Sequence, residues 1–342
     1  MTLEPHSPLI IAHRGASGYL PENTLVAKAV SHAQGAHYWE TDVLVSKDGE
    51  LVVLHDLFLE GVSDVRQRFA DRAREDGHFY VIDFTLAELR TLNLTERTIG
   101  DVSGGTALHP NRFPPGKSRF QIHTLADEIE LLQGLNQSFH REMGLYLELK
   151  APWFYEDAGF DLCLAALQTL KHYGYTQKTD AVIVETFDAR ALARIRHELM
   201  PRLKMDLRLA QLIGYKEWQT TCERDASGHW QIVDSDWMLT SAGLRKIAGY
   251  ADGVGVAIPL LFASDKDNNH IQEIPKPAAW IDEARQAGLA IHAYTLRADA
   301  LPSFAAHVDV MHEWLIDVAK VDGVFTDFPD LMLAFVRARR FE

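Results

Sequence analysis

Short apolar runs alternate with amphipathic stretches along almost the whole chain. The runs that have the length and composition of buried β-strands are residues 9–12, 37–43, 51–55, 144–149, 181–187, 206–213, 253–258, 290–296 and 323–327. Apolar positions recur at helical spacing within residues 23–34, 123–135, 158–173, 188–199, 241–250, 277–287, 311–319 and 329–339. This alternation predicts a parallel sheet with helices packed outside it.

The second and third of these strands are separated by little more than the stretch "KDGE". Parallel neighbours need a crossover of about a dozen residues or more, so residues 37–43 and 51–55 must form an antiparallel hairpin. Without the hairpin's second strand, eight strand–helix units remain. We therefore predict an α/β fold, a (β/α)₈ TIM barrel, with an open doubly wound sheet as the alternative.

Residues 57–120 do not follow the strand–helix alternation. They contain the charged stretch "DVRQRFADRAREDG", the flexible "GDVSGG" and the Pro- and Gly-rich "HPNRFPPGKS". A connection of this length is usually functional or a small subdomain. We predict a catalytic barrel domain formed by residues 1–56 and 121–342, and an insertion subdomain, residues 57–120, over the barrel mouth.

Composition narrows the range of partners. The 342 residues are 47% hydrophobic and carry a formal net charge of -14, which argues against nucleic acid and an anionic membrane surface. No stretch is long and apolar enough for stable membrane insertion, and Cys163 and Cys222 have no metal-site spacing, which favours unpaired thiols. The first residues do not resemble a signal peptide, so the chain as written is cytoplasmic, or periplasmic if a leader has been removed.

Polar side chains gather at the expected carboxyl ends of the strands, where barrel active sites lie. They are His13, Arg14, Glu40, Asp42, His55, Asp56, Glu148 and Lys150. Side chains two positions apart on a strand share a face, so each of the two strand pairs, Glu40 with Asp42 and Glu148 with Lys150, can point inward together. Converging carboxylates repel one another unless a hard divalent cation such as Ca²⁺ or Mg²⁺ compensates, whereas either pair alone would indicate an inward ion pair or a solvated strand end.

Two histidines stand out among the 16 of the chain, because both follow apolar strands and both precede a charged residue. His13 and His55, together with a metal and two cations, would form a phosphoryl-transfer site with an acid and a base. Nearby aromatic residues would line a glycerol or headgroup pocket or simply pack in the core; they are Trp153, Phe154, Phe187 and Tyr294.

The ordered series "HRGASGYLPENT", "ETD", "VVLHD", "ELKAPWF", "FDA", "HAYTLR" and "VDGVFTDFPD" resembles the glycerophosphodiester phosphodiesterases, in their long bacterial, periplasmic-type form. The resemblance runs over about residues 9 to 336. It implies a TIM barrel and hydrolysis of small-molecule glycerophosphodiesters, such as glycerophosphocholine and glycerophosphoethanolamine, to sn-glycerol 3-phosphate and an alcohol.

The resemblance also implies roles for single residues. It makes His13 and His55 the acid–base pair, and Arg14 and Lys150 the phosphate contacts. The implied metal ligands are Glu40, Asp42 and Glu148, with Ca²⁺ favoured over Mg²⁺ in the long form. We place Phe187, Tyr294, Trp153 and Glu185 with the substrate-binding group.

Glu185 departs from the family pattern, which often has an amide or small polar residue at this position. If its side chain points inward, it adds a fourth carboxylate to the site. The alternative functions are a phospholipase-like enzyme acting on intact lipid, a catalytically silent phosphate-binding barrel, and a metal-dependent amidohydrolase; the last favours paired histidines on its first strand. A homodimer is one oligomeric state compatible with the sequence.

Overall fold

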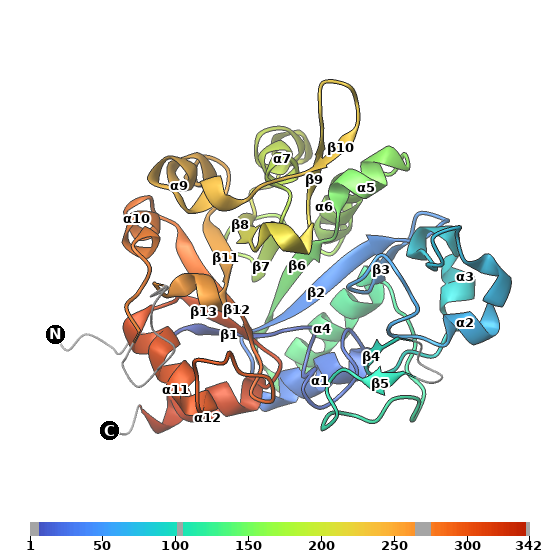
Figure 1. The fold of residues 1–342 in the computed structure, drawn as a ribbon, viewed down its shortest axis with the longest axis horizontal. Helices are drawn as coiled ribbons and strands as arrows, with labels where there is room; N and C mark the ends of the chain where they lie inside the picture. The colour runs from blue at the N-terminus through green and yellow to red at the C-terminus, as the bar shows by residue number, and fades with distance from the viewer. Residues whose placement is uncertain (1–6, 101–104, 264–274, 340–342) are drawn as a thin grey trace.

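A computed structural model describes residues 7–100, 105–263 and 275–339. Eight parallel strands form a closed barrel, in which β1 pairs with both β2 and β13. The barrel strands are β1 (Leu9–Ala12), β2 (Tyr38–Val45), β6 (Gly144–Leu149), β7 (Val182–Thr186), β8 (Arg208–Ile213), β11 (Gly253–Ala257), β12 (Ala290–Leu296) and β13 (Gly323–Thr326). The prediction of a (β/α)₈ barrel is confirmed, and the predicted strand ends differ from these by two residues or fewer (Figure 1).

The predicted hairpin is also present. Strand β3 (Leu51–Val53) pairs antiparallel with β2, with Val45 opposite Leu51 and Val43 opposite Val53. It extends the sheet outside the closed ring, so β2 continues beyond the barrel toward the insertion.

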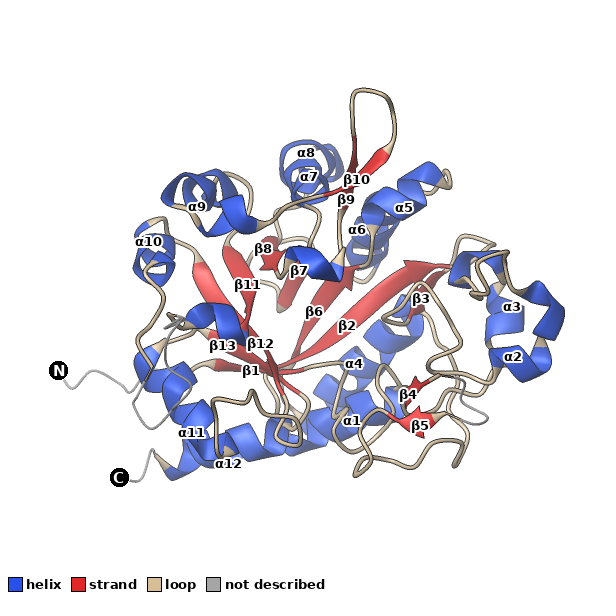
Figure 2. Cartoon of the chain, in the orientation of Figure 1, coloured by secondary structure: helices blue, strands red, loops and turns tan. Residues whose placement is uncertain are grey.

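Helices surround the barrel on its outside (Figure 2). They are α1 (Leu25–Gln34), α4 (Leu125–Phe139), α5 (Pro152–Asp157), α6 (Leu162–His172), α7 (Ala189–Arg194), α8 (Met200–Leu203), α9 (Ser241–Ala248), α10 (Trp280–Gln286), α11 (Val308–Glu313) and α12 (Pro329–Ala338). The sequence did not predict α5, which occupies the start of the connection after β6 and leaves α6 to begin at Leu162. The sequence also missed the short hairpin formed by β9 (Cys222–Arg224) and β10 (Trp230–Ile232).

The segment 57–120 forms short elements beside the barrel rather than another strand–helix unit. They are α2 (Val65–Arg68), α3 (Leu86–Leu89), β4 (Thr98–Ile99), β5 (Thr106–Ala107), and 3-10 helices at Ala70–Arg72 and Val81–Asp83. These elements gather on one side of the molecule, next to β3 and α1 (Figure 1). Hereafter the insertion means the described residues of 57–120; whether it folds as a separate subdomain stays a prediction.

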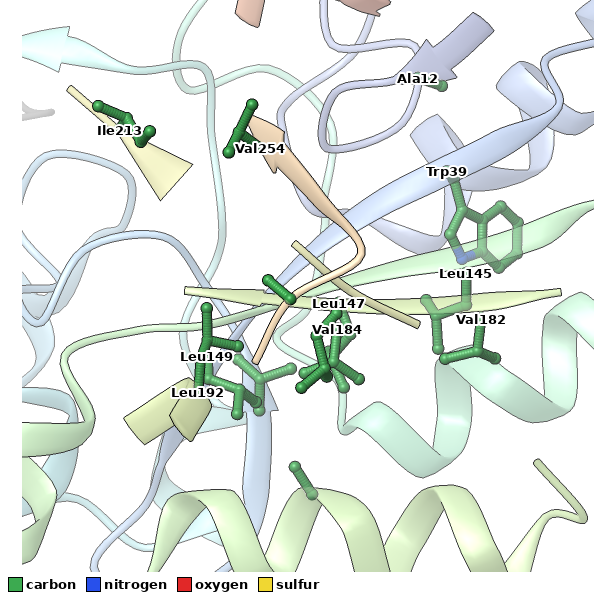
Figure 3. Packing of buried hydrophobic residues seen from close by; sticks show 14 of the residues in the cluster. Ala12, Trp39, Leu145, Leu147, Leu149, Val182, Val184, Leu192, Ile213 and Val254 are labelled. Carbon is green, nitrogen blue, oxygen red and sulfur yellow. The ribbon is translucent and has the colours of Figure 1, made fainter. Parts of the chain in front are cut away.

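Alternation along each strand divides the core into two layers. On β6, Leu145, Leu147 and Leu149 face outward and pack with Val182, Val184 and other residues under the helices (Figure 3). The intervening positions of the strands face inward. There a separate cluster fills the barrel interior: Ile11, Tyr38, Tyr146, Ile183, Ala210 and Phe325. The polar residues at the barrel mouth therefore lie above a packed cluster of aromatic and aliphatic side chains.

Both cysteines are unpaired, as the sequence favoured: Cys163 is buried and Cys222 partly exposed. Among the residues that the structure describes, no helix combines the length and hydropathy required to cross a bilayer.

Candidate active site

Four carboxylates enter the barrel mouth from three neighbouring strands. Glu40 and Asp42 lie on β2, Glu148 on β6 and Glu185 on β7, and all four are buried. Asp42 is the register partner of Glu148, and Glu148 is the partner of Glu185. Glu148 and Glu185 occupy alternate positions with outward-facing leucine and valine residues, which directs their side chains inward.

Three of these carboxylates, Glu40, Glu148 and Glu185, form a cluster that could hold a metal ion. One oxygen atom from each lies within 4.8 Å of the others. Asp42 interacts with Glu148, whose pKa it raises, and it also faces cations and an amide: its Oδ2 lies 3.2 Å from Nε of Arg14 and accepts a hydrogen bond from Asn23. The sequence placed Asp42 with the metal ligands and Glu185 with the substrate-binding residues, and both assignments stay predictions.

Burial makes this cluster costly without a cation. It raises the pKa of Glu148 to about 7 and raises the pKa values of Glu40 and Glu185, to which neighbouring carboxylates also contribute. Among the described residues, Oε2 of Glu185 and Oδ1 of Asp42 have no hydrogen-bond partner. Buried oxygen donors without partners are the set that a hard divalent ion satisfies, so these residues can hold a metal ion.

Arg14 and Lys150 bring positive charge to the same place. Nζ of Lys150 donates to Oε1 of Glu148 at 2.7 Å and lies 3.5 Å from Oδ1 of Asp42. Arg14 donates its backbone N–H to Oε2 of Glu40 at 2.8 Å and its side chain to Glu22. Two cations beside the carboxylates make the site suitable for an anionic phosphate.

The turn after β1 explains why the first strand ends at "HRG". Arg14 has a φ of 58°, in the left-handed region, and Gly15 follows with a φ of 87°. A Cβ atom on Gly15 would lie 2.7 Å from the backbone carbon of Ala27 in α1, so only glycine fits against this helix. The close turn places His13 and Arg14 at the cavity wall.

Each histidine of the site contacts an aspartate through Nδ1. Nδ1 of His13 lies 2.7 Å from Oδ1 of Asp327, which follows β13, and Nδ1 of His55 contacts Oδ1 of Asp56. Burial lowers the pKa of His13 to about 4 and also lowers the pKa of His55, with Arg14 adding to both shifts. An ionised aspartate on Nδ1 leaves Nε2 as the ring nitrogen for proton exchange.

The predicted site residues surround a cavity of about 670 Å³. Among those that line it are His13, Arg14, Glu40, His55, Glu148, Lys150, Glu185, Phe187 and Tyr294. Trp153 does not line this cavity but a neighbouring one of about 240 Å³, whose walls also include His55, Lys150 and Phe187. Asp42 does not line either cavity, but it contacts Arg14 and Lys150, which do.

Sequence reasoning named Asp56, the partner of His55, but missed Asp327, the partner of His13, and Glu22, which pairs with Arg14. Asp327 could have been found, since it ends the last barrel strand as a polar residue. Glu22, Arg97 and Arg112 carry no such signal: Glu22 lies in the turn before α1, and the two arginines lie in the irregular insertion. These residues are brought to the mouth only by the tertiary structure.

Comparison with known proteins identifies the fold and the chemistry. The sequence profile of the glycerophosphoryl diester phosphodiesterase family matches residues 13–331. The chain belongs to this family. It is therefore a phosphoric diester hydrolase, as the resemblance in its motifs implied.

Two glycerophosphodiester phosphodiesterases are similar over nearly their whole length. The protein from Haemophilus influenzae is 45% identical over 330 residues, which cover 96% of this chain and 90% of the relative. The protein from Treponema pallidum is 38% identical over 328 residues, covering 96% and 91%. The insertion lies within these alignments in large part, because they include almost all of the chain.

Solved structures of other proteins have a similar fold. A putative glycerophosphoryl diester phosphodiesterase from Silicibacter pomeroyi aligns with a TM-score of 0.65 at 20% identity, covering 98% of this chain and 95% of that one. A phosphodiesterase from Oleispira antarctica, solved in complex with the product sn-glycerol-3-phosphate, aligns with a TM-score of 0.60 at 21% identity, covering 96% and 97%. At these identities the likeness concerns the fold.

Proposed function

We propose that the chain hydrolyses water-soluble glycerophosphodiesters to sn-glycerol 3-phosphate and an alcohol, with a divalent cation and two histidines. One observation carries the proposal: His13, His55, Arg14, Lys150 and the carboxylates Glu40 and Glu148 line one cavity. Family membership supplies the reaction class, and the Oleispira antarctica relative was solved with sn-glycerol-3-phosphate.

Glu40, Asp42 and Glu148 would hold the cation, with Glu185 beside them. A bound divalent ion would supply positive charge against the non-bridging phosphate oxygens. Ca²⁺ is favoured over Mg²⁺, because Ca²⁺ accepts six to eight oxygen ligands in flexible geometry and this site offers several carboxylates on separate strands.

Arg14 and Lys150 orient the phosphate. Arg14 is fixed by Glu22 and Asp42 on one side, while Lys150 is fixed by Glu148. These contacts limit the freedom of both side chains before substrate arrives, so less ordering is needed when the diester binds. A bound phosphate would also place negative charge next to Arg14 and Lys150, whose charges are balanced by carboxylates before the substrate binds.

His13 and His55 divide the proton transfers. One accepts the proton of the attacking hydroxyl group, and the other donates a proton to the leaving alcohol oxygen. The attacking hydroxyl belongs either to water or to the neighbouring glycerol carbon. The aspartates at Nδ1 hold both rings with Nε2 available, and they stabilise the positive ring that forms during the transfer.

The two adjoining cavities offer room for both arms of a diester. They share His55, Lys150 and Phe187, so the phosphate would lie at their junction. Phe187 and Tyr294 line the larger space, and Trp153 lines the smaller one. We assign these aromatic residues to the glycerol and headgroup moieties.

Chelation followed by metal addition tests this function. The protein is treated with EDTA, dialysed, and assayed on glycerophosphocholine and glycerophosphoethanolamine with added Ca²⁺ or Mg²⁺. We expect activity to disappear on chelation and to return more fully with Ca²⁺. Intact phosphatidylcholine is assayed in parallel. Faster hydrolysis of this intact lipid than of the two glycerophosphodiesters would favour the phospholipase-like alternative. Full activity in EDTA would contradict the proposed metal dependence.

A further inference from the structure

Each of the two aspartates that hold the site histidines is in turn held by an arginine of the insertion. Asp56, the partner of His55, accepts a hydrogen bond from Arg97. Asp327, the partner of His13, accepts one from Nη2 of Arg112 at 2.7 Å. Arg97 lies just before β4, whereas Arg112 lies after β5, so one irregular segment contacts the aspartate partners of both histidines.

Arg97 joins the second histidine to the phosphate-binding arginine. Its Nη2 lies 2.6 Å from Oε1 of Glu22, and the same oxygen accepts a hydrogen bond from Nη1 of Arg14 at 2.9 Å. Arg97 therefore bridges Asp56 and Glu22, two carboxylates that belong to different loops of the barrel. Its guanidinium can serve both because its nitrogens point in fixed, separate directions.

The side chain of Arg112 is 5% exposed, compared with 20% for that of Arg97. It makes a two-pronged contact with Asp299, at 2.8 and 2.9 Å, while Nη2 also reaches Asp327. Arg297 supplies a second cation to Asp327, at 3.1 Å. Burial alone would raise the pKa of Asp327, but His13, Arg297 and Arg112 hold it below its usual range, so the carboxylate is ionised.

We propose that two insertion arginines, Arg97 and Arg112, are positioning residues for the two site histidines. Each acts through an aspartate: it fixes the carboxylate that orients the imidazole ring and sets which nitrogen carries the proton. The insertion is thus part of the catalytic apparatus. The inference rests on the proposed roles of His13 and His55, but the contacts that carry it lie outside the carboxylate cluster.

The physical reason is the direction in which an aspartate must point. An isolated Asp side chain turns about its two torsions, and a histidine bonded to it turns as well. A second, charge-assisted hydrogen bond from a guanidinium removes that freedom. Loss of the outer hydrogen bonds that orient metal-ligating side chains typically costs about 10- to 100-fold in metal affinity or activity, and we expect an effect of that order for these two histidines.

Arginine variants test the proposal by kinetics. We expect Arg97→Ala and Arg112→Ala to lower kcat on glycerophosphocholine at least tenfold while KM changes less than threefold. Arg97→Lys and Arg112→Lys keep the charge and should recover part of kcat. The matched control is Arg74→Ala, which removes a two-pronged pair with Asp83 in the same insertion, away from the site. An equal loss in Arg74→Ala, or unchanged kcat in both site variants, would overturn the proposal.

A second measurement does not depend on turnover. In protein labelled with ¹⁵N-histidine, ring signals of His13 and His55 are assigned by their absence in His13→Ala and His55→Ala. We expect Arg97→Ala to shift the His55 signals and Arg112→Ala to shift those of His13, each leaving the other ring unchanged. If neither variant, nor its lysine counterpart where alanine prevents folding, moves its ring, the arginines do not act as proposed. Absence of diesterase activity in the unmodified protein would instead refute the proposed function, and the spectra would still decide this inference.

Discussion

Glu148 and Glu185 are register partners on β6 and β7, and both carboxylates point into the barrel. Adjacent buried acids repel, and the pKa values of both are raised. Oε2 of Glu185 has no hydrogen-bond partner among the described residues, and burial and the neighbouring carboxylates outweigh the attraction of Lys150, so the pKa of Glu185 is raised. The site is therefore electrostatically unfavourable until a cation binds.

Glu185→Gln tests this relationship. In EDTA we expect its Tm to exceed that of the unmodified protein, because one repelling carboxylate is removed. The Ca²⁺ concentration that gives half of the thermal stabilisation should rise about tenfold. Asp42→Asn is the companion variant, since Asp42 faces Arg14 and Lys150. An unchanged Ca²⁺ titration with a raised KM would return Glu185 to a purely substrate-binding role.

Replacement of either site histidine should affect turnover more than binding. We expect His13→Ala and His55→Ala each to lower kcat by about 10² to 10⁴, the usual contribution of general acid–base catalysis. Steady-state kinetics on glycerophosphocholine measures kcat and KM together. His123→Ala is the control, because His123 is buried against Glu128 and does not line the cavity. Near-normal kcat in either site variant would remove that histidine from the mechanism.

A fully buried ion pair joins helices α1 and α4 and contacts strand β2. Nζ of Lys28 on α1 lies 3.0 Å from Oε1 of Glu128 on α4 and also donates to Oγ1 of Thr41 on β2. Removing one member leaves the other charge buried, which costs about 3–5 kcal/mol. We therefore expect Lys28→Met to be strongly destabilised in urea unfolding, and Lys28→Met/Glu128→Leu to recover much of the loss. A double variant less stable than the single one would contradict this account.

His292 gives the fold a defined acid sensitivity. It lies buried on β12 with Nδ1 2.8 Å from the Tyr146 hydroxyl, and burial lowers its pKa to about 4 from 6.5. The unfolded chain therefore takes up this proton first. The contribution of His292 to stability is complete above pH 6.5 and falls as the pH drops to about 4, by about 3 kcal/mol in total.

His292→Gln should accordingly show a smaller loss of unfolding free energy between pH 6.5 and 4 than the unmodified protein. Urea unfolding at several pH values in this window measures the difference. His229→Gln, at an exposed position of the β9–β10 hairpin connection, is the matched control. Parallel pH profiles for His292→Gln and the unmodified protein would show that another buried group is responsible.

The barrel could be predicted because its signal is local and repeated. Alternating apolar residues on β6 and the short "KDGE" connection between β2 and β3 determine strand direction and the number of units. The strand-end positions of Glu40, Glu148 and His13 follow from the same periodicity, and the structure brings them to one cavity. Helix α5 was not predicted, because six residues are too few to show a helical period.

The second layer of the site could not be read in this way. Arg97 and Arg112 occupy irregular backbone, where no period indicates direction, and their partners are separated from them by 41 and 215 residues. The division of the acids between cation contacts and the carboxylate cluster also depends on the order of the strands in the barrel, where β6 lies between β2 and β7, and not on sequence spacing. For that reason the sequence grouped Asp42 with Glu40, whereas the cluster with oxygen atoms within 4.8 Å of one another is formed by Glu40, Glu148 and Glu185.

The aromatic cluster that fills the barrel, with Tyr38, Tyr146 and Phe325 in it, closes the end opposite the mouth. The substrate and the products must consequently enter and leave through the same opening, the barrel mouth. The alcohol and the phosphate monoester cannot leave through the closed end of the barrel while a new diester enters through the mouth. At high concentration these products therefore compete with the diester for the same opening. The phosphate monoester, which retains the charged end that Arg14 and Lys150 are proposed to bind, is expected to be the stronger competitive inhibitor.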